Sequence, residues 1–142
     1  MAFQSSGIFV NLPVKDLEKS KNFFQSVGFE FDPNFSDEKA ACLVIGENIC
    51  AMLLVEDFFK TFTKKEVVDS TQGTEVILAL AVESREMVDE LVEKALSNGG
   101  MPSNEPQDHG FMYYRSFQDV DGHLWEVSFM DMHAVEQEEA GA

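Results

Sequence analysis

Basic residues are scarce in this chain of 142 residues. Ten lysines and arginines stand against 26 aspartates and glutamates, so the formal net charge at pH 7 is −16. A surface of this sign repels the phosphates of nucleic acids and of anionic membranes. We therefore expect neither nucleic acid nor a membrane among the partners.

Long apolar runs and cysteines are also rare. No run approaches the roughly 20 apolar residues that a membrane-spanning helix needs, and the first residues lack the pattern of a signal peptide. We therefore expect a cytoplasmic protein whose two cysteines, Cys42 and Cys50, are thiols. Because they flank a predicted turn at 46–48, they either approach each other across a hairpin or pack as small buried side chains. Two cysteines alone are too few for a zinc site.

Several sequence signatures of catalysis are missing. The chain has no glycine-rich phosphate loop, no Gly-x-Ser-x-Gly nucleophile elbow and no zinc-binding pattern. What the chain does have is an ordinary hydrophobic content of 44% and thirteen phenylalanines. A chain of this length can fold as one domain or as two small modules, and the phenylalanines predict a core or cavity with much aromatic surface.

The two halves of the chain predict the same order of elements, β-α-β-β-β. In both, an extended apolar segment runs into a helix N-cap, Asp16 in the first half and Ser84 in the second, and glycine follows the predicted helix end, at Gly28 and Gly99. Hydrophobic alternation predicts the strands. The predicted strands are 8–14, 29–31, 40–45 and 49–55, then 74–82, a short irregular strand from residue 101, 111–117 and 123–130.

This repeat predicts two similar modules. They span residues 6–56 and 74–131, with a connector carrying a short helix at 57–73 and a disordered acidic tail at 132–142. The fold class is α+β. Each four-stranded sheet has a helix on one face only, so its second face must also be covered. Two such sheets curving towards each other would enclose a central cleft.

One stretch near the end of the chain carries the clearest motif. Residues 119–122, Asp-Val-Asp-Gly, predict a tight turn, because aspartate side chains bond to nearby backbone and glycine supplies a positive φ. In the strand that follows, Leu124, Glu126 and Ser128 share one face. The opposite face, with Trp125 at its centre, is predicted to pack in the core.

The motif Asp-x-Asp-Gly-His-x-x-Glu resembles a signature of the vicinal oxygen chelate superfamily. That superfamily includes glyoxalase I, the bleomycin-resistance proteins and the extradiol dioxygenases, and the chain is similar to its lactoylglutathione lyase-like members. The resemblance covers nearly the whole chain. It implies paired β-α-β-β-β modules around a cleft, a homodimer, and a metal-ligand role in metal-dependent members for the glutamate at the position of Glu126.

The resemblance also implies three further ligand positions, one on each of three other strands. Aligned on the repeat, they fall at Phe9, Met52 and Ile77. One carboxylate does not hold a catalytic metal alone, so we expect no cofactor and no catalytic divalent metal. A register shifted by two residues would instead bring Asn11 or Glu75 towards such a site, and this alternative stays open.

The strand beside Glu126 presents a second choice. Either Tyr114 or its neighbour Arg115 faces the cleft, and Arg115 there would pair with Glu126. Tyr114 there would orient a ligand through its hydroxyl. The candidate ligand-binding residues are Phe9, Asn11, Met52, Ile77, Tyr114, Arg115 and Glu126.

The sequence supports three functions. The first is a protein that binds a small apolar or aromatic molecule in the cleft without a catalytic metal, as the resemblance to the bleomycin-resistance branch implies. The second is a divergent lyase or isomerase of glyoxalase type, in which Glu126 is a metal ligand or general base. The third is a non-catalytic interaction domain. In every case we expect a homodimer.

Overall fold

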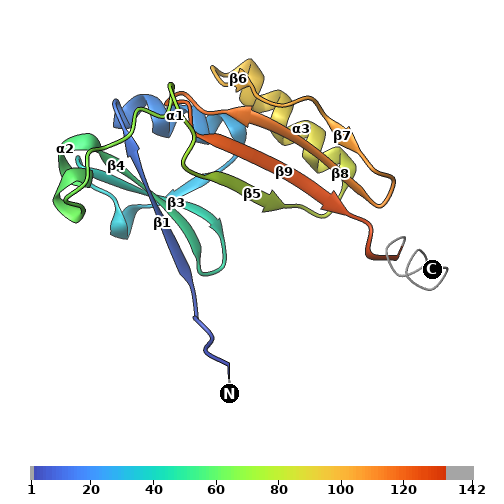
Figure 1. Ribbon diagram of the computed structural model, residues 1–142, viewed down its shortest axis with the longest axis horizontal. Helices are drawn as coiled ribbons and strands as arrows, with labels where there is room; N and C mark the ends of the chain where they lie inside the picture. The colour runs from blue at the N-terminus through green and yellow to red at the C-terminus, as the bar shows by residue number, and fades with distance from the viewer. Residues whose placement is uncertain (1, 134–142) are drawn as a thin grey trace. The chain divides into compact units, whose positions relative to one another are not determined.

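The computed structural model describes residues 2–133 of the chain. The chain divides into two compact units, Met1–Asp69 and Ser70–Ala142, and the boundary falls inside the predicted connector. Each unit contains one β-sheet and one long helix (Figure 1). The predicted α+β class is confirmed. The tail beyond residue 133 lies outside the described residues.

The first unit forms a four-stranded sheet in the order β1-β4-β3-β2. β1 runs parallel to β4, and the other pairs are antiparallel. The elements in chain order are β1 (Ile8–Val14), α1 (Leu17–Val27), β2 (Glu30–Asp32), a 3-10 turn (Pro33–Phe35), β3 (Ala40–Gly46), β4 (Ile49–Val55), α2 (Glu56–Phe59) and a second 3-10 turn (Lys60–Phe62).

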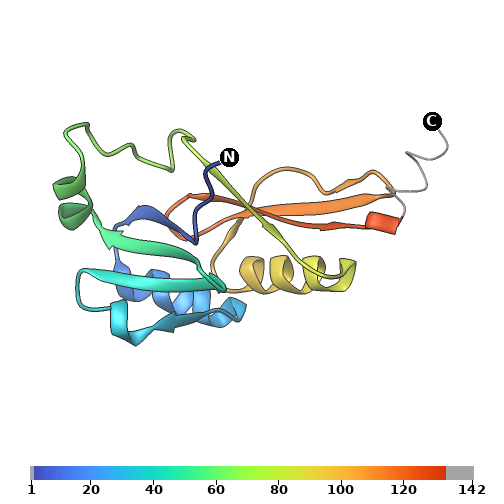
Figure 2. The same ribbon diagram turned by 90° about the horizontal axis from the view of Figure 1, so that it is seen from below.

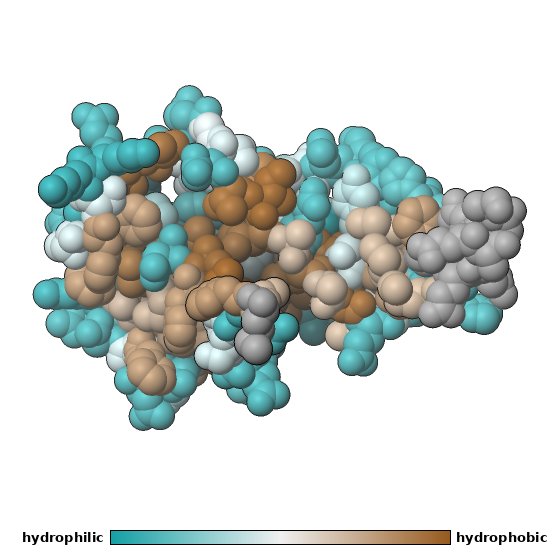
Figure 3. All heavy atoms as spheres, turned by 60° about the horizontal axis from the view of Figure 1, so that its bottom comes forward, coloured by the Kyte–Doolittle hydropathy of each residue, from teal (hydrophilic) through white to brown (hydrophobic). Residues whose placement is uncertain are grey.

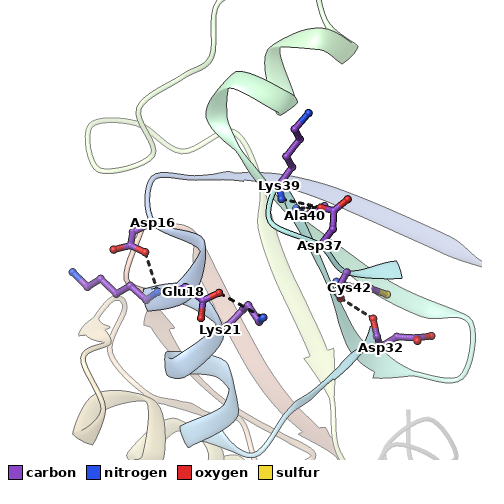
Figure 4. Close-up of polar contacts among 10 residues, drawn as sticks. Asp16, Glu18, Lys21, Asp32, Asp37, Lys39, Ala40 and Cys42 are labelled. Carbon is purple, nitrogen blue, oxygen red and sulfur yellow. Dashed lines mark hydrogen bonds and ion pairs between the residues drawn. The ribbon is translucent and has the colours of Figure 1, made fainter. Parts of the chain in front are cut away.

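Local side-chain chemistry sets the ends of these elements. The Asp16 carboxylate accepts from the Lys19 amide at 3.1 Å and so caps α1 (Figure 4). Gly28 ends the helix with φ of 119°, a left-handed conformation that glycine adopts without strain. The Asp37 carboxylate accepts from the amides of Lys39 and Ala40 and so fixes the turn that leads into β3 (Figure 4). The predicted helix bounds are confirmed.

Helix α1 covers one face of the first sheet (Figure 2). Its Phe23 and Phe24 are almost fully buried, as are Leu43 and Leu53 of the sheet. Full burial of a side chain of this size stabilises the fold by about 1.5–3 kcal/mol. Alternation along the strands places Phe9, Asn11 and Met52 on the other face.

The second unit repeats this plan with one difference: its sheet has five strands, not the predicted four. The strand order is β5-β9-β8-β6, and β7 also pairs with β8. The elements are β5 (Ile77–Ala81), α3 (Arg85–Ser97), β6 (Met101–Pro102), β7 (Gln107–Asp108), β8 (Met112–Gln118) and β9 (Leu124–Met130). The segment after α3 is split into β6 and β7 because Pro102 and Pro106 lack the amide hydrogen that continuous pairing requires.

Helix α3 lies along one face of this sheet, as Figure 2 shows. Val88 and Val92 of α3 are buried, as are Trp125 and Phe117 of the sheet. The two aromatic rings stack with centroids 6.4 Å apart and an interplanar angle of 4°. The predicted core position of Trp125 is confirmed. Among residues 2–133, no helix is long and apolar enough to cross a membrane.

Candidate functional site

Glu126 lies on the face of the second sheet opposite α3. In β9 it is in register with Ala79 of β5 and with Ser116 of β8, so the three side chains share this face. Tyr114 and Ser128 form the next pair on the same face. We call this surface the open face of the second sheet.

The Glu126 side chain is half-buried. Within the described part of the chain, its carboxylate makes no hydrogen bond and no ion pair. Its register partner Ser116 instead bonds to the backbone of Asn104, accepting from the amide at 2.9 Å and donating to the carbonyl at 3.3 Å. Glu126 therefore keeps its hydrogen-bonding capacity for a group that approaches the open face.

Of the two alternatives that the sequence left open, the pairing of Arg115 with Glu126 does not occur in the described structure. Arg115 is in register with Val127 and points to α3, where its guanidinium donates to Asp89 at 3.0 Å and to Glu93 at 2.6 Å. The reason is the strand period of two, which puts residues 115 and 126 on opposite faces once β8 and β9 pair. Of the two candidates, Tyr114 shares the face of Glu126.

The helix side of β8 carries a hydrogen-bonded network. The Tyr113 hydroxyl donates to Asp89 at 2.5 Å, and this bond lowers the pKa of the Asp89 carboxyl. Arg85 lies over the Tyr113 ring at 5.1 Å and forms a bidentate pair with Asp108, which lowers the pKa of Asp108 to about 2. These bonds connect α3 to β7 and β8.

The first sheet has a corresponding open face. In register, Phe9 lies beside Cys50, and Asn11 lies beside Met52. Phe9 is 64% exposed, and Ile77 on the second sheet's open face is 50% exposed. Apolar side chains of this kind are visible at the protein surface in Figure 3. Exposed phenylalanine and isoleucine on a sheet face are a feature of surfaces that bind apolar groups.

The two cysteines lie near each other on the first open face. Cys42 is 1% exposed, whereas Cys50 is half-buried, and both are free thiols. Burial first, and then interaction with the neighbouring Cys50 thiol, raises the pKa of Cys42 to about 11. Of the two sequence alternatives, the approach across the hairpin occurs, and Cys42 is buried as well.

This difference predicts the order of alkylation. With iodoacetamide at pH 8, we expect Cys50 to react first, because Cys42 is inaccessible and the thiolate is the reactive species. Peptide mass spectrometry over a time course measures the alkylation rate of each cysteine. In urea-unfolded protein the two rates should become equal. Equal rates in the folded protein would contradict the prediction.

The turn at 119–122 contains a feature that the sequence analysis missed. Asp119 is 3% exposed; its carboxylate accepts from the amides of Asp121 and His123 at 2.9 and 3.0 Å and from the Trp125 indole at 3.0 Å. Burial raises the pKa of Asp119, whereas His123 and the Trp125 N–H act in the opposite direction. The sequence signal for this hydrogen bond was the spacing Asp-x5-Trp, which separates Asp119 from Trp125.

A hollow of about 670 Å³ lies in the first unit, away from the open face residues discussed above. Its lining is mostly charged: the lysines are Lys15, Lys60, Lys64 and Lys65, and the acids are Glu56, Glu66 and Asp69. Charged lining residues of this kind do not favour binding of an apolar molecule. The hollow also contains none of the predicted site residues.

Comparison with known proteins shows which family model and which solved structures this chain is similar to. Residues 8–46 match the model of the bleomycin resistance protein-like N-terminal family. A hypothetical protein from S. aureus is 29% identical, with a TM-score of 0.75 over 89% of this chain and 95% of that one. The fold is that of the vicinal oxygen chelate superfamily. No curated protein matches the sequence.

Two other solved structures carry descriptive names. The fosfomycin resistance protein FosX from Listeria monocytogenes is 27% identical, with a TM-score of 0.62 over 89% of this chain and 92% of that one. A glyoxalase-related enzyme from Fulvimarina pelagi is 20% identical, with a TM-score of 0.74 over 89% and 88% of the two chains. The resemblance read from the Asp119–Glu126 motif is therefore confirmed at the level of the superfamily.

The residues that the resemblance aligns with metal-ligand positions do not fit a catalytic divalent metal. Phe9 and Ile77 carry no donor atom, and Met52 offers only a thioether, a poor ligand for the divalent ions that prefer oxygen and nitrogen. Glu126 alone has the right chemistry. Among residues 2–133, no three His, Cys, Asp or Glu side chains are grouped to hold a metal. Glu75 lies outside β5 and is exposed, so it does not complete the set.

Proposed function

We propose that this protein, whose fold is that of the vicinal oxygen chelate superfamily, binds a small apolar or aromatic molecule on an open face of its sheets, without a catalytic metal. The observation that carries the proposal is that exposed Ile77 shares the open face of the second sheet with Glu126, a carboxylate that has no ion-pair partner in the described chain. Ligand sites are mostly apolar surfaces with a few polar groups that fix orientation.

Each candidate residue has a separate role in this proposal. Phe9, Met52 and Ile77 supply apolar contact area, and aromatic faces favour planar ligands. Tyr114 and Glu126 supply a hydroxyl and a carboxylate on one face. Asn11 offers an amide on the first open face. The matching family model and one similar structure carry names that refer to bleomycin and fosfomycin resistance, and this supports a small molecule as the ligand.

The proposal predicts how a neutral apolar dye binds. Phe9→Ala and Ile77→Ala should each weaken Nile red binding, Phe9→Ala by about tenfold, because the lost aromatic contact is worth about 1–2 kcal/mol. Fluorescence titration measures the affinity. Phe3→Ala is the matched control, since Phe3 is 93% exposed and lies before β1. Equal Nile red affinity for wild type, Phe9→Ala, Ile77→Ala and Phe3→Ala would contradict the proposal.

The alternative function, a lyase or isomerase of glyoxalase type, makes the opposite prediction. If Glu126 were a metal ligand or general base, nickel or zinc would stimulate turnover of the hemithioacetal of methylglyoxal and glutathione. We expect turnover at background level, because three of the four ligand positions lack suitable donors. Robust metal-stimulated turnover would overturn the metal-free proposal. The homodimer and the cytoplasmic location stay predictions.

A further inference from the structure

Three sulfur-bearing side chains adjoin one another on the open face of the first sheet. Cys42 of β3 is the direct register partner of Met52 of β4. Cys50 precedes Met52 by two residues on the same strand and therefore points to the same face. The Cys42 and Cys50 thiols are close enough to interact. The chain has only these two cysteines, and both belong to this cluster.

The strand register disfavours a disulfide between the two thiols. Cys50 is opposite Val44, not Cys42, so the two cysteines are diagonal neighbours. Diagonal residues in an antiparallel pair lie about 7–8 Å apart, whereas a disulfide requires Cα atoms within about 7 Å. A metal ion between the two sulfurs suits this wider separation of the cysteines. A disulfide holds its sulfurs about 2 Å apart, whereas two sulfur–metal bonds of about 2.3 Å each let the sulfurs lie roughly twice as far apart.

We propose that Cys42 and Cys50, with Met52 as a third ligand, bind one Cu(I) ion. Thiolate and thioether sulfurs are soft ligands that select Cu(I). Cu(I) is stable with two or three ligands, whereas structural zinc takes four and iron–sulfur clusters need four cysteines. Binding replaces both thiol protons: Cu⁺ and two thiols give a bis-thiolate complex of net charge −1 and two released protons, without electron transfer.

The surroundings of the cluster favour the lower oxidation state of copper. Cys42 is 1% exposed, and the next register pair on this face, Ala40 with Leu54, is also buried. Cys50 and Met52 are half-buried, so they leave a way in from the open face. Half-buried Asp32 is in register with Cys42 on the other side, and its carboxylate is the charged neighbour of an otherwise apolar setting. Apolar neighbours disfavour the doubly charged Cu(II), because the cost of desolvating an ion increases with its charge.

The site is tested with Cu(I) under anaerobic conditions, in competition with the chelator bicinchoninate. Wild-type protein should take up one Cu(I) per chain and develop an ultraviolet thiolate-to-copper charge-transfer band. Cys50→Ser should weaken binding about 100-fold or more, because even residues behind the ligands often cost 10–100-fold. Met52→Leu keeps the apolar volume and should weaken binding about tenfold, as expected for the weaker thioether ligand.

Controls separate a lost ligand from a lost fold. Met101→Leu removes an exposed thioether from the second unit and should bind Cu(I) as wild type does. Thermal unfolding of Cys50→Ser should match wild type, since Cys50 is only half-buried. Equal competition by wild type and Cys50→Ser would overturn the proposal, as would an X-ray absorption spectrum with only nitrogen and oxygen neighbours. Nile red binding tests the proposed function separately, so one can fail without the other.

Discussion

Asp119→Ala is expected to lower the free energy of unfolding by about 3 kcal/mol, the largest effect on stability that we predict. The carboxylate accepts three hydrogen bonds, and it is 3% exposed. Its removal leaves the buried Trp125 N–H without this partner, and an unpaired buried donor costs about 1–3 kcal/mol. Loss of the two turn bonds adds to that cost. Urea unfolding followed by far-ultraviolet circular dichroism measures the change, and this signal does not depend on Trp125.

Asp108→Ala is the matched control for this experiment. Asp108 lies in the same unit and accepts two bonds from Arg85, but its side chain is 55% exposed. Exposed ion pairs contribute about 0–1 kcal/mol, so the control should change stability little. The Asp119→Ala effect should also shrink in a Trp125→Phe background, because the indole donor is then absent. Equal losses for Asp119→Ala and Asp108→Ala would show that burial of the turn is not the cause.

Glu126→Gln is expected to leave stability within about 0.5 kcal/mol of wild type and to weaken binding of a cationic aromatic dye about tenfold. Stability should hold because the carboxylate has no ion-pair partner in the described chain, and Arg115 is bonded to α3. Dye affinity should fall because a charge-assisted contact to the carboxylate is lost. Crystal violet is a suitable probe, with Nile red as the neutral comparison.

The matched control is Glu105→Gln. It removes the same charge from an exposed position in the second unit, so it corrects for the general attraction of cations to a chain of net charge −16. Crystal violet should bind this variant almost as it binds wild type, because exposed charges are screened by salt. A large loss of melting temperature for Glu126→Gln, with unchanged dye affinity, would instead assign Glu126 a structural role.

Local sequence signals predicted most of the elements. The caps Asp16 and Ser84 begin the two long helices where expected, and Gly28 ends the first one. The alternation 124-126-128 placed Glu126 on the face opposite the core. These predictions succeed because capping, turn formation and strand period depend on residues within a few positions of one another. Prolines shortened and split the strand after α3, and the five-stranded sheet follows from that split.

The sequence by itself determined the repeated β-α-β-β-β plan, the resemblance to the superfamily and the lack of side-chain oxygen or nitrogen donors at Phe9, Met52 and Ile77. Only the tertiary structure decided that Arg115 bonds to α3 while Tyr114 shares the face of Glu126. The physical reason is register: a shift of one residue between β8 and β9 would exchange the two faces. Strand pairing and contact with α3 fix this register, and both join residues far apart in the chain.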